Sequence, residues 1–287
     1  MPKTIKTLAA ACAIVASLGA SAIASAAPDL ASEMSLQFSR HLIGVLQSGQ
    51  GDARAAQLVG ESADQFPALL ELAMHGGQYE NCTYAPASPL AQDRLRSIAD
   101  GWEFFQRGSE AIRQGQPVME QIAGAVNTIT KNQPSLLELS EQVAAFIALN
   151  NGSTINITTA SRLSFLTERL DDSTRRMLAE SFVNPEAAFL MGKDTNQFRD
   201  LVQGLLNGSP VLHTTPTKGL VRDKLNEIVK LLQSDTQARD IILNNLQTLI
   251  TVKAAVRMVV GEPARSERLL QQLRDLHDKL PPGQDCH

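Results

Sequence analysis

Residues 90–105 read LAQDRLRSIADGWEFF, and Leu95, Ile98, Trp102 and Phe105 recur within them at intervals of three and four residues. This spacing places the four side chains on one face of an α-helix. The stretch therefore predicts an amphipathic helix whose apolar face packs on other helices. Comparable stripes recur along the chain at Met34, Phe38, Leu42 and Val45, at Leu58, Phe66, Leu69 and Ala73, and at Val118, Ile122, Val126 and Ile129.

Composition extends this expectation to the whole chain. Of 287 residues, 43% are hydrophobic but only 4% are aromatic, and no alternating strand pattern of useful length competes with the helical stripes. A β-sandwich depends on aromatic and β-branched residues, so the expected fold class is all-α. The net charge of −4 argues against general attraction to nucleic acid or to anionic lipid.

Several residues predict where the helices end. Gly76 and Gly77 end the second stripe, and residues 77–89 contain Gly, Asn, Pro and Ser, which predicts a connecting loop. Pro117 and Pro134 lie inside a long helical tract and are expected to kink or break it.

The chain repeats itself at a nearly constant offset of about 130 residues, which predicts two tandem up-and-down helical bundle modules. We place the first module at residues 27–150 and the second at residues 151–280, followed by a tail at 281–287. The matched segments are Ala31–Arg40 with Ala160–Arg169, Gln65–Gly76 with Gln197–Gly208, and Leu90–Ile98 with Leu220–Ile228.

Residues 1–26 have the pattern of a secretory signal peptide. Lys3 and Lys6 precede an apolar run, and Ala24-Ser25-Ala26 supplies small residues for cleavage before Ala27. No later segment reaches 18 apolar residues, so no stable membrane anchor is expected. The sequence predicts a periplasmic or secreted protein.

Export would leave two cysteines, Cys82 and Cys286, in a compartment where disulfides persist. Two cysteines allow one bridge, and an exposed free thiol is a liability outside the cell, so the bridge is favoured. The alternative is a pair of separate free thiols.

The repeated pattern resembles the periplasmic sensor region of type IV pilus methyl-accepting chemotaxis transducers, the PilJ family, which is related to the NarX-type nitrate sensors. Residues 160–169, ASRLSFLTER, are similar to the family signature, and residues 31–40 match it more faintly. The resemblance implies a sensor-like helical bundle of bacterial origin, here expected to lack the membrane span, HAMP linker and signalling region. Nitrate-sensing relatives hold an anion with an arginine of the signature. Ser35 and Ser164 take that place here, so no nitrate-type site is expected.

No enzyme is expected, and no cofactor or metal. The chain contains no His-Glu-x-x-His, Gly-x-Ser-x-Gly or Cys-x-x-Cys motif. Asp171-Asp172 and Arg175-Arg176 stand at the i, i+4 spacing of ordinary surface ion pairs.

Two functions remain open. The first is an interaction module whose partner is an envelope protein such as pilin or a chemotaxis transducer, and homodimers are compatible with it because related sensors are dimers. The alternative is a periplasmic protein that binds a small ligand within the helix bundle or at a dimer interface. For either, the first candidates are the polar residues of the repeated signature: Ser35, Arg40, Ser164, Thr167 and Arg169.

Overall fold

The computed structural model describes residues 27–286, so the predicted signal peptide lies outside the described residues. Within this range the chain forms eight α-helices and one short β-hairpin, which confirms the all-α prediction. The elements are α2 (Leu30–Ser48), α3 (Ala53–His75), β1 (Gly77–Tyr79), β2 (Cys82–Tyr84), α4 (Pro89–Leu149), α5 (Thr154–Ala179), α6 (Pro185–Asn207), α7 (Leu220–Asn244), α8 (Leu246–Val260) and α9 (Pro263–Arg274).

The chain divides into two compact units. Unit 1 holds the described residues up to Gln116 and those from Ala254 onward, and unit 2 is Pro117–Lys253. Helices α4 and α8 therefore contribute residues to both units. These units do not coincide with the predicted modules at 27–150 and 151–280. The two modules stay a prediction from the sequence repeat, because a division of the chain into compact units does not test whether its structure repeats.

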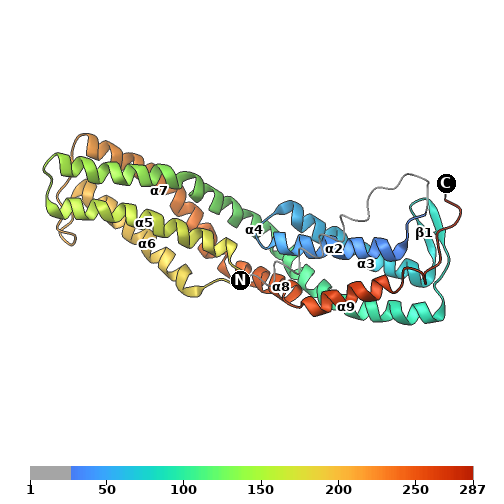
Figure 1. The fold of residues 1–287 in the computed structure, drawn as a ribbon. Coiled ribbons are helices and arrows are strands. Elements are labelled where there is room, and N and C mark those ends of the chain that lie inside the picture. The colour runs from blue at the N-terminus through green and yellow to red at the C-terminus, as the bar shows by residue number, and fades with distance from the viewer. Residues whose placement is uncertain (1–26, 287) are drawn as a thin grey trace. The chain divides into compact units, whose positions relative to one another are not determined.

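Aromatic side chains fill the centre of unit 1, where α2 and α3 lie side by side (Figure 1). The Phe66 and Trp102 rings stack with centroids 4.3 Å apart, and Phe105 meets Phe38 edge-on at 4.8 Å. All four side chains are buried. The apolar face predicted for residues 90–105 therefore packs into this core, where such ring pairs add to the stability gained from burial.

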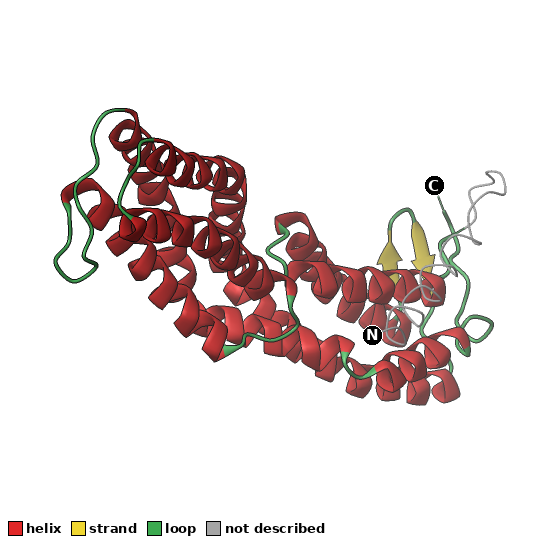
Figure 2. Ribbon diagram, turned by 60° about the vertical axis from the view of Figure 1, so that its left-hand side comes forward, coloured by secondary structure: helices red, strands yellow, loops and turns green. Residues whose placement is uncertain are grey.

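Mostly aliphatic side chains fill the core of unit 2. Figure 2 draws its helices in red and its loops in green. Helices α5 and α6 pack against each other, and α7 packs on α6. Polar caps satisfy the first backbone N–H groups: Ser153 accepts from Asn156 at the start of α5, and Asn184 accepts from Glu186 at the start of α6. The buried side chains include Leu163, Leu166, Leu170, Phe198, Leu201, Leu205, Leu225, Ile228 and Leu232.

The expectation that Pro117 and Pro134 kink or break the long helical tract is corrected in part: neither proline breaks it, because α4 runs from Pro89 to Leu149 with both inside it. A kink at either position stays a prediction. A proline removes one backbone donor from a helix and crowds one carbonyl. Buried side chains follow each proline, Met119 after Pro117 and Leu136 after Pro134. We attribute the continuity of α4 to this packing, which outweighs the loss of single hydrogen bonds.

The expectation that residues 77–89 form only a loop is also corrected. Strands β1 and β2 pair as an antiparallel hairpin, with Gly77 opposite Tyr84 and Tyr79 opposite Cys82. The strands have three residues each, too few for an alternating pattern to show in the sequence. Thr83 and Gln284 exchange two backbone hydrogen bonds of 2.8 Å, so the C-terminal segment extends the hairpin.

Gly108 allows α4 and α8 to approach closely in unit 1. A Cβ atom there would lie 2.3 Å from Cγ2 of Val259, which is fully buried. We expect Gly108→Ala to lower the free energy of unfolding by about 1–3 kcal/mol, despite the better helix propensity of alanine. Gly124→Ala in the same helix is the matched control, because a Cβ there meets nothing within 4 Å. That variant should gain up to about 1 kcal/mol in urea unfolding. Equal effects at both positions would contradict the close approach.

Candidate binding sites

A buried histidine joins three helices of unit 1. His41 of α2 places Nδ1 3.0 Å from the Ser62 hydroxyl of α3 and Nε2 2.9 Å from the Ser109 hydroxyl of α4. Each hydroxyl also lies within hydrogen-bond distance of a carbonyl of its own helix, Leu58 for Ser62 and Phe105 for Ser109. A neutral imidazole has one donor and one acceptor nitrogen, so this arrangement satisfies every polar atom of the cluster.

The environment of His41 is that of a structural residue. Burial lowers the pKa of its imidazole from 6.5 to about 4, and a hydrogen bond involving the Val59 backbone opposes the shift. The side chain has no solvent exposure, and its two side-chain hydrogen-bond partners are serines. A general base needs a reachable substrate proton, and this ring nitrogen has no path to one.

The lowered pKa predicts how unit 1 responds to acid. The unfolded chain binds a proton near pH 6.5 and the folded chain only near pH 4, so stability falls as the pH drops between these values. The loss from this group is about 3 kcal/mol. His41→Gln should flatten this part of the pH dependence. Urea unfolding followed by the fluorescence of Trp102, the single tryptophan, measures it. A variant that loses as much stability as the wild type between pH 7 and pH 4 would refute the assignment.

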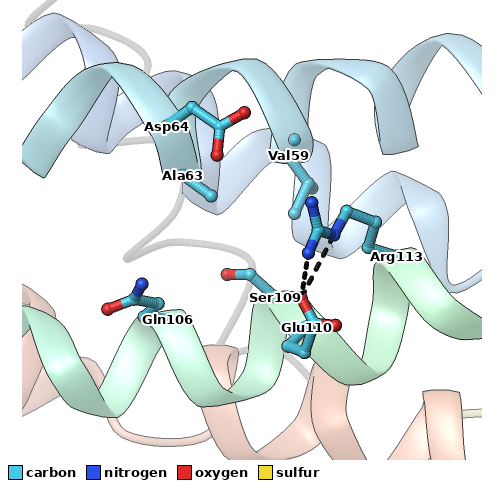
Figure 3. A pocket seen from close by; sticks show the side chains of 8 residues that line it. Val59, Ala63, Asp64, Gln106, Ser109, Glu110 and Arg113 are labelled. Atoms are coloured by element: carbon cyan, nitrogen blue, oxygen red, sulfur yellow. Dashed lines mark hydrogen bonds and ion pairs between the residues drawn. The ribbon is translucent and has the colours of Figure 1, made fainter. Parts of the chain in front are cut away.

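A small cavity lies between α3 and α4 beside this cluster (Figure 3). Its volume is about 60 Å³, and its lining includes Val59, Asp64 and Ser109. At its rim Arg113 donates to Glu110 over 3.1 Å from Nε. Sites for organic ligands usually enclose about 300–1,000 Å³, so this cavity holds water and little more. A wider depression of about 380 Å³ is lined by charged and amide side chains of α4 alone: Glu103, Gln106, Arg107 and Glu110.

Unit 2 buries a charged cluster. The Arg239 guanidinium lies 3.5 Å from the Asp235 carboxylate one turn earlier in α7, and both side chains are at most 2% exposed. Asn132 of α4 donates to the same carboxylate over 2.7 Å. Burial raises the pKa of Asp235 and lowers the pKa of Arg239, whereas their mutual attraction opposes both shifts. The cluster therefore depends on its pairing to remain charged.

Two nitrogens of Arg239, Nε and Nη1, have no hydrogen-bond partner among the described residues, and neither has Oδ1 of Asp171. Asp171 of α5 is buried, which raises the pKa of its carboxyl, and its charge attracts Arg239. Its other oxygen lies 2.5 Å from the exposed Arg175. The expectation of ordinary surface pairs thus holds for Asp172 and Arg176, but Asp171 is a core carboxylate.

The structure engages most of the predicted signature residues inside their own units. In unit 1 the Ser35 hydroxyl donates to the Ala31 carbonyl one turn earlier, and Arg40 is exposed. In unit 2 the buried Thr167 donates to the Leu163 carbonyl, and Ser164 is half-buried.

Arg169 is held by two partners in unit 2. It forms a bidentate ion pair with the fully buried Asp194 of α6, with Nε 2.5 Å from Oδ2, and its guanidinium lies 5.3 Å from the centroid of the Phe165 ring. The Asp194 carboxylate already occupies the guanidinium donors of Arg169 with which an arginine binds an anion. A role for these five residues in binding stays a prediction.

The predicted disulfide is confirmed. Cys82 of β2 and Cys286 are bonded, with Cα atoms 4.2 Å apart, and the two residues are separated by 204 in the sequence. Tyr84 lies beside them and donates from its hydroxyl to the Pro28 carbonyl over 2.7 Å. The bond and the two Thr83–Gln284 hydrogen bonds fasten the C-terminal segment to the hairpin.

Metal clusters and membrane-spanning helices are both absent from the part of the chain that the structure describes. Between residues 27 and 286, no three His, Cys, Asp or Glu side chains gather in a way that would hold a metal ion. In the same range, no helix is both long and apolar enough to cross a membrane.

Comparisons with known proteins agree with the predicted resemblance. The chain is 22% identical to PilJ of Pseudomonas aeruginosa over 243 residues, which are 84% of this chain and 35% of PilJ. It is 24% identical over 252 residues to AlkN of Alcanivorax borkumensis, a protein named for methyl-accepting chemotaxis, with 87% and 35% of the two chains covered. The chain thus spans about a third of the length of these curated relatives. The resemblance to a PilJ-like sensor domain is confirmed.

Family models and solved structures add little to this likeness. No protein-family model matches the chain. Among solved structures, the TorS sensor domain in complex with TorT aligns with 85% of this chain and 99% of its own at 13% identity, with a TM-score of 0.30. A TM-score of this size does not establish a shared fold.

Proposed function

We propose that the chain is a non-catalytic, exported interaction module that binds another envelope protein of a type IV pilus or chemosensory system. The observation that carries the proposal is the similarity to PilJ and AlkN, which extends over 84% and 87% of the chain. The partner is pilin or a chemotaxis transducer, and a homodimer is compatible with this role.

Export is supported by two features. Residues 1–26 have the basic, apolar and small-residue pattern of a cleaved signal peptide. The Cys82–Cys286 bond belongs in a compartment where disulfides persist. Together they favour the periplasm as the location of the protein.

Matched connections between helices support the proposed repeat. Helices α3 and α6 both end at a glycine with positive φ, Gly76 and Gly208. A proline, Pro86 or Pro216, then packs on each glycine. One residue later a backbone N–H returns to the preceding helix: Ala87 donates to Ala73, and Thr217 to Leu205. The same local structure thus occurs twice at the spacing of the sequence repeat, as expected for two tandem modules at 27–150 and 151–280.

The site geometry favours a protein partner over a small ligand. The cavity between α3 and α4 is well below the size of an organic-ligand site, and the wider depression is lined by four polar side chains of α4 without the apolar walls that are typical of such sites. Ser35, Thr167 and Arg169 are hydrogen-bonded within their own units, whereas Arg40 is exposed at the surface. Of the five signature residues, Arg40 is the one we propose for contact with a partner.

Affinity capture tests the proposed function. Residues 27–287 serve as bait in cross-linked envelope extract of the source organism, and captured proteins are identified by mass spectrometry. We expect reproducible recovery of pilin or of a chemotaxis transducer, above the level obtained with heat-denatured bait. Recovery of neither would reject this function.

A further inference from the structure

Two connections, with the helix residues next to them, form one end of unit 2, which we call the tip: residues 149–155, from the last residue of α4 into α5, and residues 208–220, from the end of α6 to the first residue of α7. Asn156 ties them together, because its side chain donates to the Thr215 carbonyl over 2.9 Å and accepts from the Thr215 N–H over 3.1 Å. Figure 2 shows the connections as green loops at the left. The tip is therefore one continuous surface.

Large apolar side chains project from this surface. Leu149, Ile155, Val211 and Leu220 are 77%, 46%, 87% and 53% exposed, respectively. The loop after α6 is held in place by hydrogen bonds. Ser209 and Thr214 exchange two backbone hydrogen bonds, and the Thr214 hydroxyl donates to the Gly204 carbonyl. An ordered surface that displays several apolar side chains is typical of an interaction site.

The tip is also distinguished by its charge. Residues 142–167 and 201–222 contain no Asp or Glu, although the chain as a whole has a net charge of −4. Three exposed cations, Arg162, Lys218 and Arg222, lie in these two segments. Asp223, in the first turn of α7, is the first acidic residue after the second of these segments, so the cations outnumber the carboxylates beside the apolar side chains. A surface with this excess of positive charge is complementary to a partner that carries carboxylates.

In unit 1 the connection between α3 and α4 corresponds to residues 208–220, and the C-terminal segment of the chain covers it. There, Thr83 of the hairpin pairs with Gln284, and Asp285 and Cys286 follow in the same extended segment. With the repeat offset of about 130 residues, His213 corresponds to Thr83. The backbone N–H and C=O groups of His213 form no hydrogen bond with another described residue. The connection that an extended segment covers in unit 1 is thus uncovered in the described part of unit 2.

We propose that the tip of unit 2 is a docking surface for an acidic segment of a partner protein, whose apolar side chains contact Val211 and Leu149 and whose carboxylates face Lys218 and Arg222. The proposal rests on the proposed function and assigns a contact in unit 2 for the same partner, in addition to the contact proposed for Arg40 in unit 1.

Site-specific photo-cross-linking in cells that make the full chain tests the proposal. Val211 is replaced by p-benzoylphenylalanine, and Phe189 of α6 is the matched control position, because it is an exposed apolar residue of unit 2 outside the tip. We expect adducts at position 211 with one recurrent protein, through a segment that contains Asp or Glu. Lys218→Glu should lower their yield at least threefold, whereas Lys193→Glu, an equal charge change in α6, should not.

Each other outcome overturns the proposal. Adducts with lipid would make the tip a membrane contact, and adducts with a second copy of this chain would make it a dimer interface. Equal yields in the two Lys→Glu variants would remove the role of charge. Adducts at position 189 alone would reject the tip and leave the proposed function intact. Absence of adducts at both positions rejects the tip, and affinity capture then decides the proposed function separately. Unchanged far-UV circular dichroism confirms that each variant is folded.

Discussion

Arg239→Met is expected to lower the free energy of unfolding of unit 2 by about 3–5 kcal/mol, the usual consequence of removing one partner of a buried ion pair. The variant leaves the Asp235 carboxylate buried, with Asn132 as its remaining donor. Methionine replaces most of the volume of arginine, so the loss comes from the uncompensated charge and not from a cavity. Far-UV circular dichroism follows the helices of both units and Trp102 fluorescence reports on unit 1, so a circular dichroism transition without a fluorescence change belongs to unit 2.

A second pair in the same unit provides the control. Asp172 and Arg176 have the same residue types and the same i, i+4 spacing as Asp235 and Arg239, but their side chains are 59% and 61% exposed. Arg176→Met should therefore change stability by less than about 0.5 kcal/mol. Similar losses in the two variants would show that burial does not set the strength of the pair.

The loss in Arg239→Met should depend on pH. Burial already raises the pKa of Asp235 and Asp171, and removal of the cation raises both further. A raised carboxyl pKa destabilises the folded state above that pKa, and this penalty disappears as the pH falls toward the value of the unfolded chain. The deficit of the variant should therefore be smaller at pH 5 than at pH 7. A deficit that grows on acidification would contradict the assignment.

The second large effect concerns the disulfide. Cys82→Ser together with Cys286→Ser should lower the stability of unit 1 by about 4 kcal/mol, because the bond closes a loop across 204 positions. Trp102 fluorescence during urea unfolding measures the change. The hairpin should be affected most, since Gln284 pairs with Thr83 next to the bond.

Reduction provides the control for this variant. Dithiothreitol should destabilise the wild type by the same amount and leave the double variant unchanged. Alkylation of the native, unreduced protein at both Cys82 and Cys286 would show that the bond is absent.

The sequence was sufficient for the helices and for the disulfide. The helical spacing of Leu95, Ile98, Trp102 and Phe105 is visible in the local sequence, and all four side chains are buried in the core. The two cysteines allow one bridge, and that bridge is present. Local rules did not decide whether Pro117 and Pro134 would break the helix, and α4 continues through both. The hairpin escaped prediction because strands of three residues contain no measurable period.

The buried polar clusters could not be predicted from sequence. Asp172–Arg176 and Asp235–Arg239 are the same pattern in the sequence, and only packing with α4 and α5 separates a surface pair from a core pair. Arg169 was identified as a candidate for binding. Its partner Asp194 lies on the following helix, α6, and no local signal in the sequence connects the two.

The interleaving of the two units also fixes an order of events during synthesis. All residues of unit 2 are made before residues 254–286, which unit 1 needs for α9 and for the partner of Cys82. At translation rates of about 5–20 residues per second, Cys82 waits roughly 10–40 seconds for Cys286. During that interval the hairpin lacks the segment that pairs with Thr83 in the folded protein, and Cys82 lacks its bonding partner. The nascent chain therefore contains every residue of unit 2 before it contains the residues that complete unit 1, and the Cys82–Cys286 bond can form only after almost the whole chain has been made.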